Sequence, residues 1–137
     1  MIKLKDLLTE GKISSDVERA AKKAGFKFKK ITNDITTNKF SNPTGDVKKM
    51  GKDVENVEMN QWMSDEKSVT KQNYEELGMK LIKLLSSKYV PIKKEKYGDR
   101  GGVKFMNRKK DPRSEFWISY DKTIAGPYIS YRGLKGV

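Results

Sequence analysis

The sequence predicts an α+β domain in which N-terminal helices pack on a C-terminal antiparallel β-meander of about four strands. Two observations carry this prediction. In the first two thirds of the chain, apolar residues recur three and four positions apart, as they do on one face of a helix. From Tyr89 onward, short aromatic-rich segments of alternating polarity lie between turn sequences, as strands do. Helices first and strands last are typical of the α+β class.

Within residues 12–137, three helices are expected, over about 16–24, over 47–57 and over about 71–87. Ser15 and Glu18 form a capping-box pattern at the start of the first helix, and Gly25 ends it. Asn73 with Glu76 would cap the third helix, which has the widest apolar stripe. The second helix is predicted from one apolar face, made up of Val47, Met50, Val54 and Val57. Trp62 and Met63 follow it and would anchor this part of the chain in the core.

Strand signals are short at first and become strong toward the C-terminus. Phe26–Lys29 alternates as a short strand, the polar segment 32–38 continues it weakly as strand or loop, and Ser41–Gly45 is a turn cluster. The meander is expected from four segments, Val90–Tyr97, Val103–Met106, Glu115–Tyr120 and Tyr128–Arg132. Pro91 confines the first of these to an edge or to its first residues. Gly98–Gly102 lacks the spacing of a phosphate-binding loop and is predicted to be a hairpin turn.

Composition narrows the possible chemistry. The 137 residues suit one domain, and they include no cysteine and no histidine. Thiolate and histidine metal sites are therefore excluded, as are Cys-His and Ser-His-Asp enzymes. We expect no catalytic site, no metal and no cofactor, although a small nuclease or transferase using Lys, Tyr and Asp stays open as a weaker alternative. No apolar run approaches the roughly 20 residues needed to span a bilayer, so we expect no membrane partner.

The chain is strongly basic, with a net charge of +12. Residues 1–87 carry 17 basic and 13 acidic side chains, whereas residues 88–137 carry 13 and 5. Most of the positive field therefore lies in the last third. A field of this sign and size favours a polyanionic partner, which could be nucleic acid, an acidic protein or an anionic membrane face.

The best candidate site in the body of the chain is the basic segment Arg108–Arg113. As a hairpin tip it would present cations to phosphates, so we predict a sequence-tolerant nucleic-acid contact made by Arg108, Lys109, Lys110, Arg113, Arg100 and Lys104. A plain solvated loop is an equal alternative. The nearby aromatic residues Trp117, Tyr120, Tyr128 and Tyr131 could stack bases, but a sheet exposes only one face, so we favour a place for them in the core.

The first eleven residues form a separate unit in this interpretation. Leu4, Leu7 and Leu8 share one face of a short amphipathic helix, and Gly11 is a natural stop. So short a helix does not persist alone in water and must dock on its own domain or on a partner. We therefore divide the chain into residues 1–11, a leader or a short amphipathic helix, and residues 12–137, a single basic α+β domain.

Leu8, Thr9, Glu10 and Gly11 resemble the cleavage site used in head maturation of T-even-type tailed phages. In that family a prohead protease cuts after a Leu/Ile-x-Glu triplet and before a small residue, and the leader that it removes directs internal proteins into the assembling head. This triplet before a small residue occurs only once in the chain. The resemblance covers residues 1–11 alone. It implies contacts with phage head proteins and the prohead protease, and a location in the virion interior or, after ejection, the host cytoplasm.

Together these observations predict a non-enzymatic, virion- or head-associated phage protein whose basic body contacts packaged DNA or, after ejection, a host target. The alternative is a phage or bacterial accessory protein with no cleaved leader, which binds nucleic acid or a host protein through its sheet and basic tip.

Overall fold

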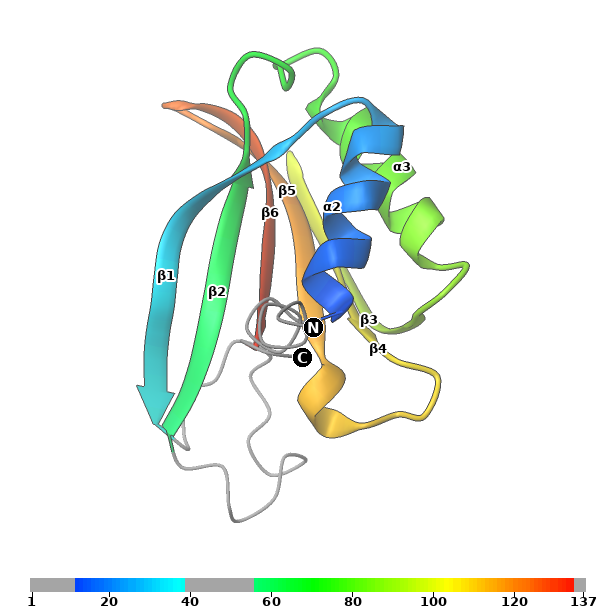
Figure 1. Ribbon diagram of the computed structural model, residues 1–137. Helices are drawn as coiled ribbons and strands as arrows, with labels where there is room; N and C mark the ends of the chain where they lie inside the picture. The colour runs from blue at the N-terminus through cyan, green and yellow to red at the C-terminus, as the bar shows by residue number, and fades with distance from the viewer. Residues whose placement is uncertain (1–11, 39–55, 135–137) are drawn as a thin grey trace, which may run out of the picture.

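The computed structural model describes residues 12–38 and 56–134. Its helices and strands, in chain order, are α2 (Lys12–Ala24), β1 (Phe28–Asn38), β2 (Asn56–Ser64), α3 (Tyr74–Leu85), β3 (Val90–Tyr97), β4 (Arg100–Met106), the 3₁₀ helix η2 (Pro112–Ser114), β5 (Phe116–Thr123) and β6 (Gly126–Leu134). They form a sheet-rich α+β fold in which both α-helices cover one face of a curved antiparallel sheet (Figure 1).

The prediction of a four-strand meander is wrong. It has six strands in the order β1-β2-β6-β5-β4-β3. The four C-terminal strands pair in sequence, but β6 also pairs with β2 along Met59–Met63, and β1 pairs with β2 beyond it. The N-terminal half of the chain therefore supplies two strands of the same sheet as well as a helix.

Helix α3 connects β2 to β3 across one face of the sheet. Strand β2 lies inside the sheet and β3 lies at its far edge, so the chain must cross one face of the sheet between them. It does so through α3, which packs against β5 and against α2 (Figure 1). Pro91 lies in this edge strand, as predicted, and edge strands are where a residue without an N–H is tolerated in a sheet.

Helix α2 begins four residues earlier than predicted, at Lys12. The predicted capping box is therefore wrong, because Ser15 lies inside the helix and not before it. Ile13 extends the apolar face by a turn and is 6% exposed, so packing favours the longer helix. The predicted end is confirmed. Gly25 has φ of 112°, and the N–H of Phe26 donates to the Ala21 carbonyl over 3.0 Å, as in a Schellman motif.

Two other predicted elements need correction near β1 and β2. The strand predicted over Phe26–Lys29 begins at Phe28 and continues through the weakly predicted polar segment to Asn38. The helix predicted over 47–57 falls mostly outside the described residues, but Asn56 and Val57 begin β2 and are not helical. Trp62, expected to anchor this part of the chain, is 6% exposed.

Helix α3 is shorter than the predicted 71–87 and starts without the predicted side-chain cap. The Asn73 side chain is used in the preceding turn. Its Oδ1 accepts from the Thr70 N–H over 2.6 Å, and its Nδ2 donates to the Ser68 carbonyl. Glu75 and Glu76 still lie in the first turn, where negative charge is favourable.

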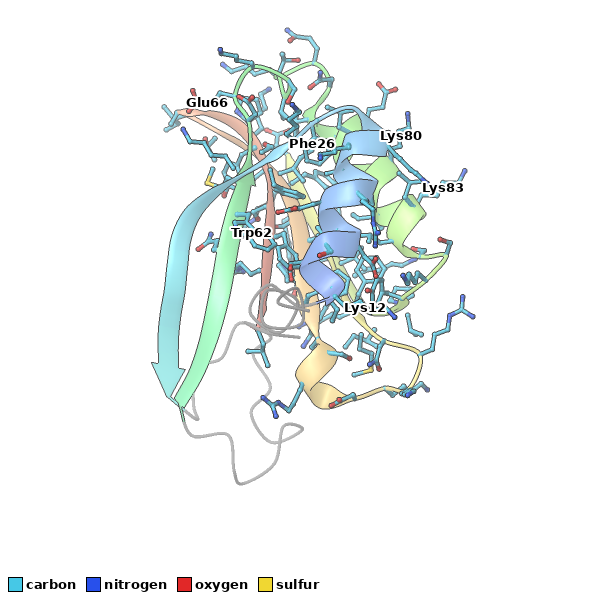
Figure 2. The ribbon with its side chains drawn as sticks, viewed as in Figure 1. Lys12, Phe26, Trp62, Glu66, Lys80 and Lys83 are labelled. Atoms are coloured by element: carbon cyan, nitrogen blue, oxygen red, sulfur yellow. The ribbon has the colours of Figure 1, made fainter. Side chains whose placement is uncertain are left out.

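The core lies between the two helices and the covered face of the sheet. Phe26 and Trp62 enter it from the β1–β2 side (Figure 2). Its largest fully buried side chains are Tyr131, Phe105, Phe116, Leu81, Ile118 and Ile129. Because residues alternate along a strand, the neighbours of these strand residues lie on the opposite face, which the described helices leave uncovered.

Candidate nucleic-acid interface

The basic connection, residues 108–113, follows β4 and is held by its own polar groups. Asn107 Oδ1 accepts from the Asp111 N–H over 3.1 Å, and Asp111 Oδ1 accepts from the Arg113 N–H over 2.9 Å. Ser114 Oγ accepts from the Asn107 N–H over 2.9 Å, which ties the end of η2 to the end of β4. The connection is thus a fixed turn, and its one carboxylate is engaged with the backbone.

The four cations of this connection, Arg108, Lys109, Lys110 and Arg113, are all exposed. Arg108 Nη2 donates to the Ser87 carbonyl over 2.6 Å, which positions that guanidinium beside the end of α3. Within residues 12–38 and 56–134, none of the four forms an ion pair. The structure therefore presents four accessible positive charges on one short turn.

Two of the six predicted contact residues do not join this cluster. Lys104 is 8% exposed, and its Nζ lies 3.4 Å from Oε1 of the buried Glu115. A buried charge needs a partner, and Glu115 provides one, so Lys104 differs from the exposed cations of the basic connection and its nucleic-acid contact stays a prediction. Arg100 is exposed but lies at the opposite end of β4, about 20 Å along the strand from the basic connection.

The aromatic side chains divide between the two faces of the sheet. Tyr120 and Tyr131 are 5% and 2% exposed and belong to the core, as favoured from the sequence. Trp117 and Tyr128 are half-buried and lie on the face opposite the helices. The preference for a core position was therefore right for two of these residues and wrong for the other two.

This open face carries a groove that the sequence did not reveal. The sheet-face groove is a cavity of about 260 Å³ over β3–β6, lined by Glu95, Tyr97, Arg100, Gly101, Gly102, Trp117, Ser119, Tyr120, Asp121, Tyr128 and Arg132. The strand register explains it. Gly102, Ser119 and Ser130 pair across β4, β5 and β6 and form a row of small residues.

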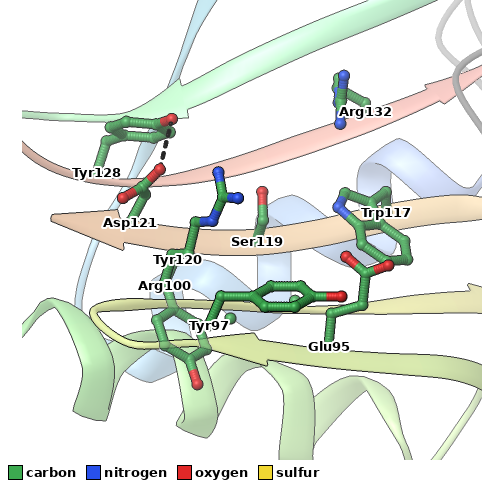
Figure 3. A pocket seen from close by; sticks show the side chains of 11 residues that line it. Glu95, Tyr97, Arg100, Trp117, Ser119, Tyr120, Asp121, Tyr128 and Arg132 are labelled. Atoms are coloured by element: carbon green, nitrogen blue, oxygen red, sulfur yellow. Dashed lines mark hydrogen bonds between the residues drawn. The ribbon is translucent and has the colours of Figure 1, made fainter. Parts of the chain in front are cut away.

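Larger side chains flank this row on both sides. Trp117 pairs with Arg132 on the side toward the basic connection, and Asp121 pairs with Tyr128 on the other side. Figure 3 shows these four side chains on the same face of the sheet. Residue 102 must be small for the groove to stay open, because a Cβ there would lie 3.3 Å from both Ser119 Cβ and Trp117 Cε2.

Partners within the described chain already hold the two acidic residues of the groove. The Tyr128 hydroxyl donates to Asp121 Oδ2 over 3.4 Å, the contact drawn as a dashed line in Figure 3. Burial, with the charge of Asp121, raises the pKa of Tyr128, so the phenol keeps its proton. Glu95 Oε1 lies 3.3 Å from Lys93 Nζ.

The two arginines of the groove, unlike its two acidic residues, are not held by an oppositely charged or hydrogen-bonding side chain in the described part of the chain. Neither Arg100 nor Arg132 forms an ion pair with any residue of the described chain. Arg100 instead lies 5.6 Å from the centre of the Tyr97 ring, a cation–π arrangement. Arg132 is half-buried beside Trp117. The groove therefore combines aromatic surface with positive charge that is open to an anion.

The part of the sequence that carries the cleavage motif, Leu8, Thr9, Glu10 and Gly11, lies outside the described residues. Within the described ranges, no group of three or more acidic residues is arranged to hold a metal ion. Neither described α-helix combines the length and the apolar composition that crossing a bilayer requires. Comparisons of the chain with protein-family models, with curated proteins and with solved structures found no match.

Proposed function

We propose that this is a non-enzymatic protein that binds nucleic acid through the phosphate backbone, with the basic connection as its contact. The single observation that supports this is the cluster of Arg108, Lys109, Lys110 and Arg113, which is exposed and has no ion-pair partner in the described chain. The net charge of +12 adds a long-range attraction to any polyanion.

The mechanism is the release of counterions. Each cation that meets a phosphate frees a condensed counterion, so affinity falls steeply with salt and depends little on sequence. On duplex DNA each contact adds about −0.9 to the slope of log K against log salt, so four contacts correspond to a slope of roughly −3.6.

The test is a charge reversal with a matched control. The variant Arg108→Glu/Lys109→Glu/Lys110→Glu should lose affinity for duplex DNA at low salt, and the slope of its salt dependence should become shallower, as measured by fluorescence anisotropy. The control Lys22→Glu/Lys80→Glu/Lys83→Glu changes the net charge equally on exposed positions of the two helices. Figure 2 labels Lys80 and Lys83 on α3. If both variants lose the same affinity, only the total charge matters and the proposed contact is wrong.

We further propose that the protein is a head-associated protein of a tailed phage, delivered by a leader that ends at Glu10. The support is the resemblance of Leu8, Thr9, Glu10 and Gly11 to the prohead-protease site, together with a basic body suited to lie beside packaged DNA. Mass spectrometry of purified particles should find an N-terminal peptide that begins at Gly11. If the protein is instead absent from particles and keeps its intact N-terminus, the alternative of an accessory protein without a cleaved leader is favoured.

A further inference from the structure

We infer that the sheet-face groove binds the unpaired bases of a single-stranded nucleic acid. Trp117 and Tyr97 provide stacking surfaces, and Arg132 and Arg100 provide contacts to the sugar-phosphate backbone. This inference rests on the proposed nucleic-acid binding and deepens it, because it gives the protein a preference for single strands over duplexes.

The aromatic surface of the groove is the first support. Tyr97 is 60% exposed, and Trp117 is half-buried on the open face. The other tryptophan, Trp62, is 6% exposed and stacks on Tyr131 with ring centres 4.7 Å apart. The chain thus buries one tryptophan in its core and leaves part of the other free for a planar ligand. Bases stack on such rings with little regard to sequence, because every base has a π-face.

The charges of the groove are the second support. Asp121 receives the Tyr128 hydroxyl, and Glu95 pairs with Lys93, so both acids have partners. Arg100 and Arg132 form no ion pair within the described chain. Arg132 lies directly across the strand pair from Trp117. A nucleotide whose base lies on Trp117 therefore has a guanidinium beside it for its phosphate.

The size of the groove selects among ligands. Pockets for complete small molecules have volumes of roughly 300–1,000 Å³. At about 260 Å³ the groove is smaller and open, which suits one base of a longer chain that continues over the surface. Duplex DNA does not fit this mode, since its bases are stacked and paired inside the helix and present only their edges in the grooves. Duplex DNA therefore contacts only the basic connection.

The wild-type protein gives the first test, with three probes of equal phosphate number: a short oligothymidylate, an abasic strand and a duplex. We expect the oligothymidylate to bind about tenfold more tightly than the abasic strand at the same salt, as base–aromatic stacking predicts. It should also quench tryptophan fluorescence, and this signal reports Trp117 because Trp62 is buried. Oligouridylate in place of oligothymidylate assigns the groove to RNA if it binds more tightly, and to DNA if it binds more weakly.

Variants give the second test. Trp117→Ala should bind oligothymidylate about tenfold more weakly and leave duplex affinity unchanged. Trp117→Phe keeps an aromatic plane, so it should retain most of the affinity while the quenching disappears. Arg132→Gln should weaken the binding of both single strands, abasic included. Met79→Ala is the control, because Met79 is 54% exposed on α3, away from the groove.

The two proposals fail in different ways. If the oligothymidylate and the abasic strand bind equally and without quenching, the groove binds no base and this inference is overturned, while duplex binding preserves the proposed function. If none of the probes binds at low salt, the proposed function fails as well. The probe comparison uses wild-type protein, so a misfolded Trp117→Ala variant would not prevent a decision.

Discussion

Gly78 of α3 lies directly against the ring of Tyr120 in β5, so that a Cβ at residue 78 would lie 2.7 Å from Tyr120 Cδ2. At the other end of the same side chain, the Tyr120 hydroxyl lies against Gly101 of β4, so close that it leaves no room for a Cβ at residue 101. Two glycines thus let a helix and a strand close on one aromatic ring. Because β5 also carries Trp117, Ser119 and Asp121, this contact fixes the strand that forms the centre of the sheet-face groove.

Gly78→Ala should therefore destabilise the protein although alanine is the better helix former. The helix gains about 1 kcal/mol from the substitution. Overpacking against Tyr120 costs about 1–3 kcal/mol, because a Cβ only 2.7 Å from the ring forces the ring or the helix to shift. We expect a net loss of about 1 kcal/mol in the free energy of unfolding, measured by urea titration. Met79→Ala, one residue along the same helix but exposed, should stay within about 0.5 kcal/mol of wild type. A Gly78→Ala variant more stable than wild type would contradict the tight contact.

Asp16 makes the stability of the fold depend on pH in the acid range. Its carboxylate is 7% exposed and receives the Tyr89 hydroxyl over 2.5 Å and Lys88 Nζ over 2.9 Å, with Arg19 as a third donor. Burial alone would raise the pKa of Asp16, but these donors together lower it below its ordinary value of 3.8. The group ties α2 to the residue that precedes β3.

The sign of the resulting pH dependence follows from linkage. A carboxyl whose pKa is lowered by folding contributes stability above its unfolded pKa, and this contribution is lost as the pH falls through the lower folded value. Asp16→Asn should lose about 1–3 kcal/mol at neutral pH, and its free energy of unfolding should fall less steeply on acidification. Urea titrations from neutral pH down through the acid range check this. An unchanged slope in the variant would mean that other carboxyl groups cause the acid sensitivity.

The parts of the fold that the sequence predicted are those encoded locally. The aromatic alternation of β5 and β6 and the apolar face of α3 lie within single segments, so they were recognised. Strand β1 was missed in part because its residues 32–38 are polar, and it is a strand through its pairing with β2. Val57 fitted a helical spacing with Val47, Met50 and Val54, yet it lies in β2, which adds to β6, a strand that comes some seventy residues later in the chain.

In the candidate site, too, the locally encoded part could be predicted and the part that depends on strand pairing could not. The basic connection is one continuous segment, so its cations were found by reading along the chain. The sheet-face groove depends on the alignment of Gly102, Ser119 and Ser130 across three strands. That register is a tertiary property. Trp117 and Asp121 were visible as outward candidates only once Phe116, Ile118 and Tyr120 were known to face the core.

Lys104 offers a direct test of the difference between the predicted and the observed interface. Its ion pair with Glu115 lies inside the protein, so Lys104→Gln should cost about 3 kcal/mol in the free energy of unfolding, the usual result of removing one member of a buried pair. The double variant Lys104→Met/Glu115→Leu removes both charges and should recover part of that loss. Both variants, once folded, should bind duplex DNA with the affinity of wild type. A stable Lys104→Gln protein that binds DNA as weakly as the charge-reversed basic connection would instead return Lys104 to the contact surface that the sequence predicted.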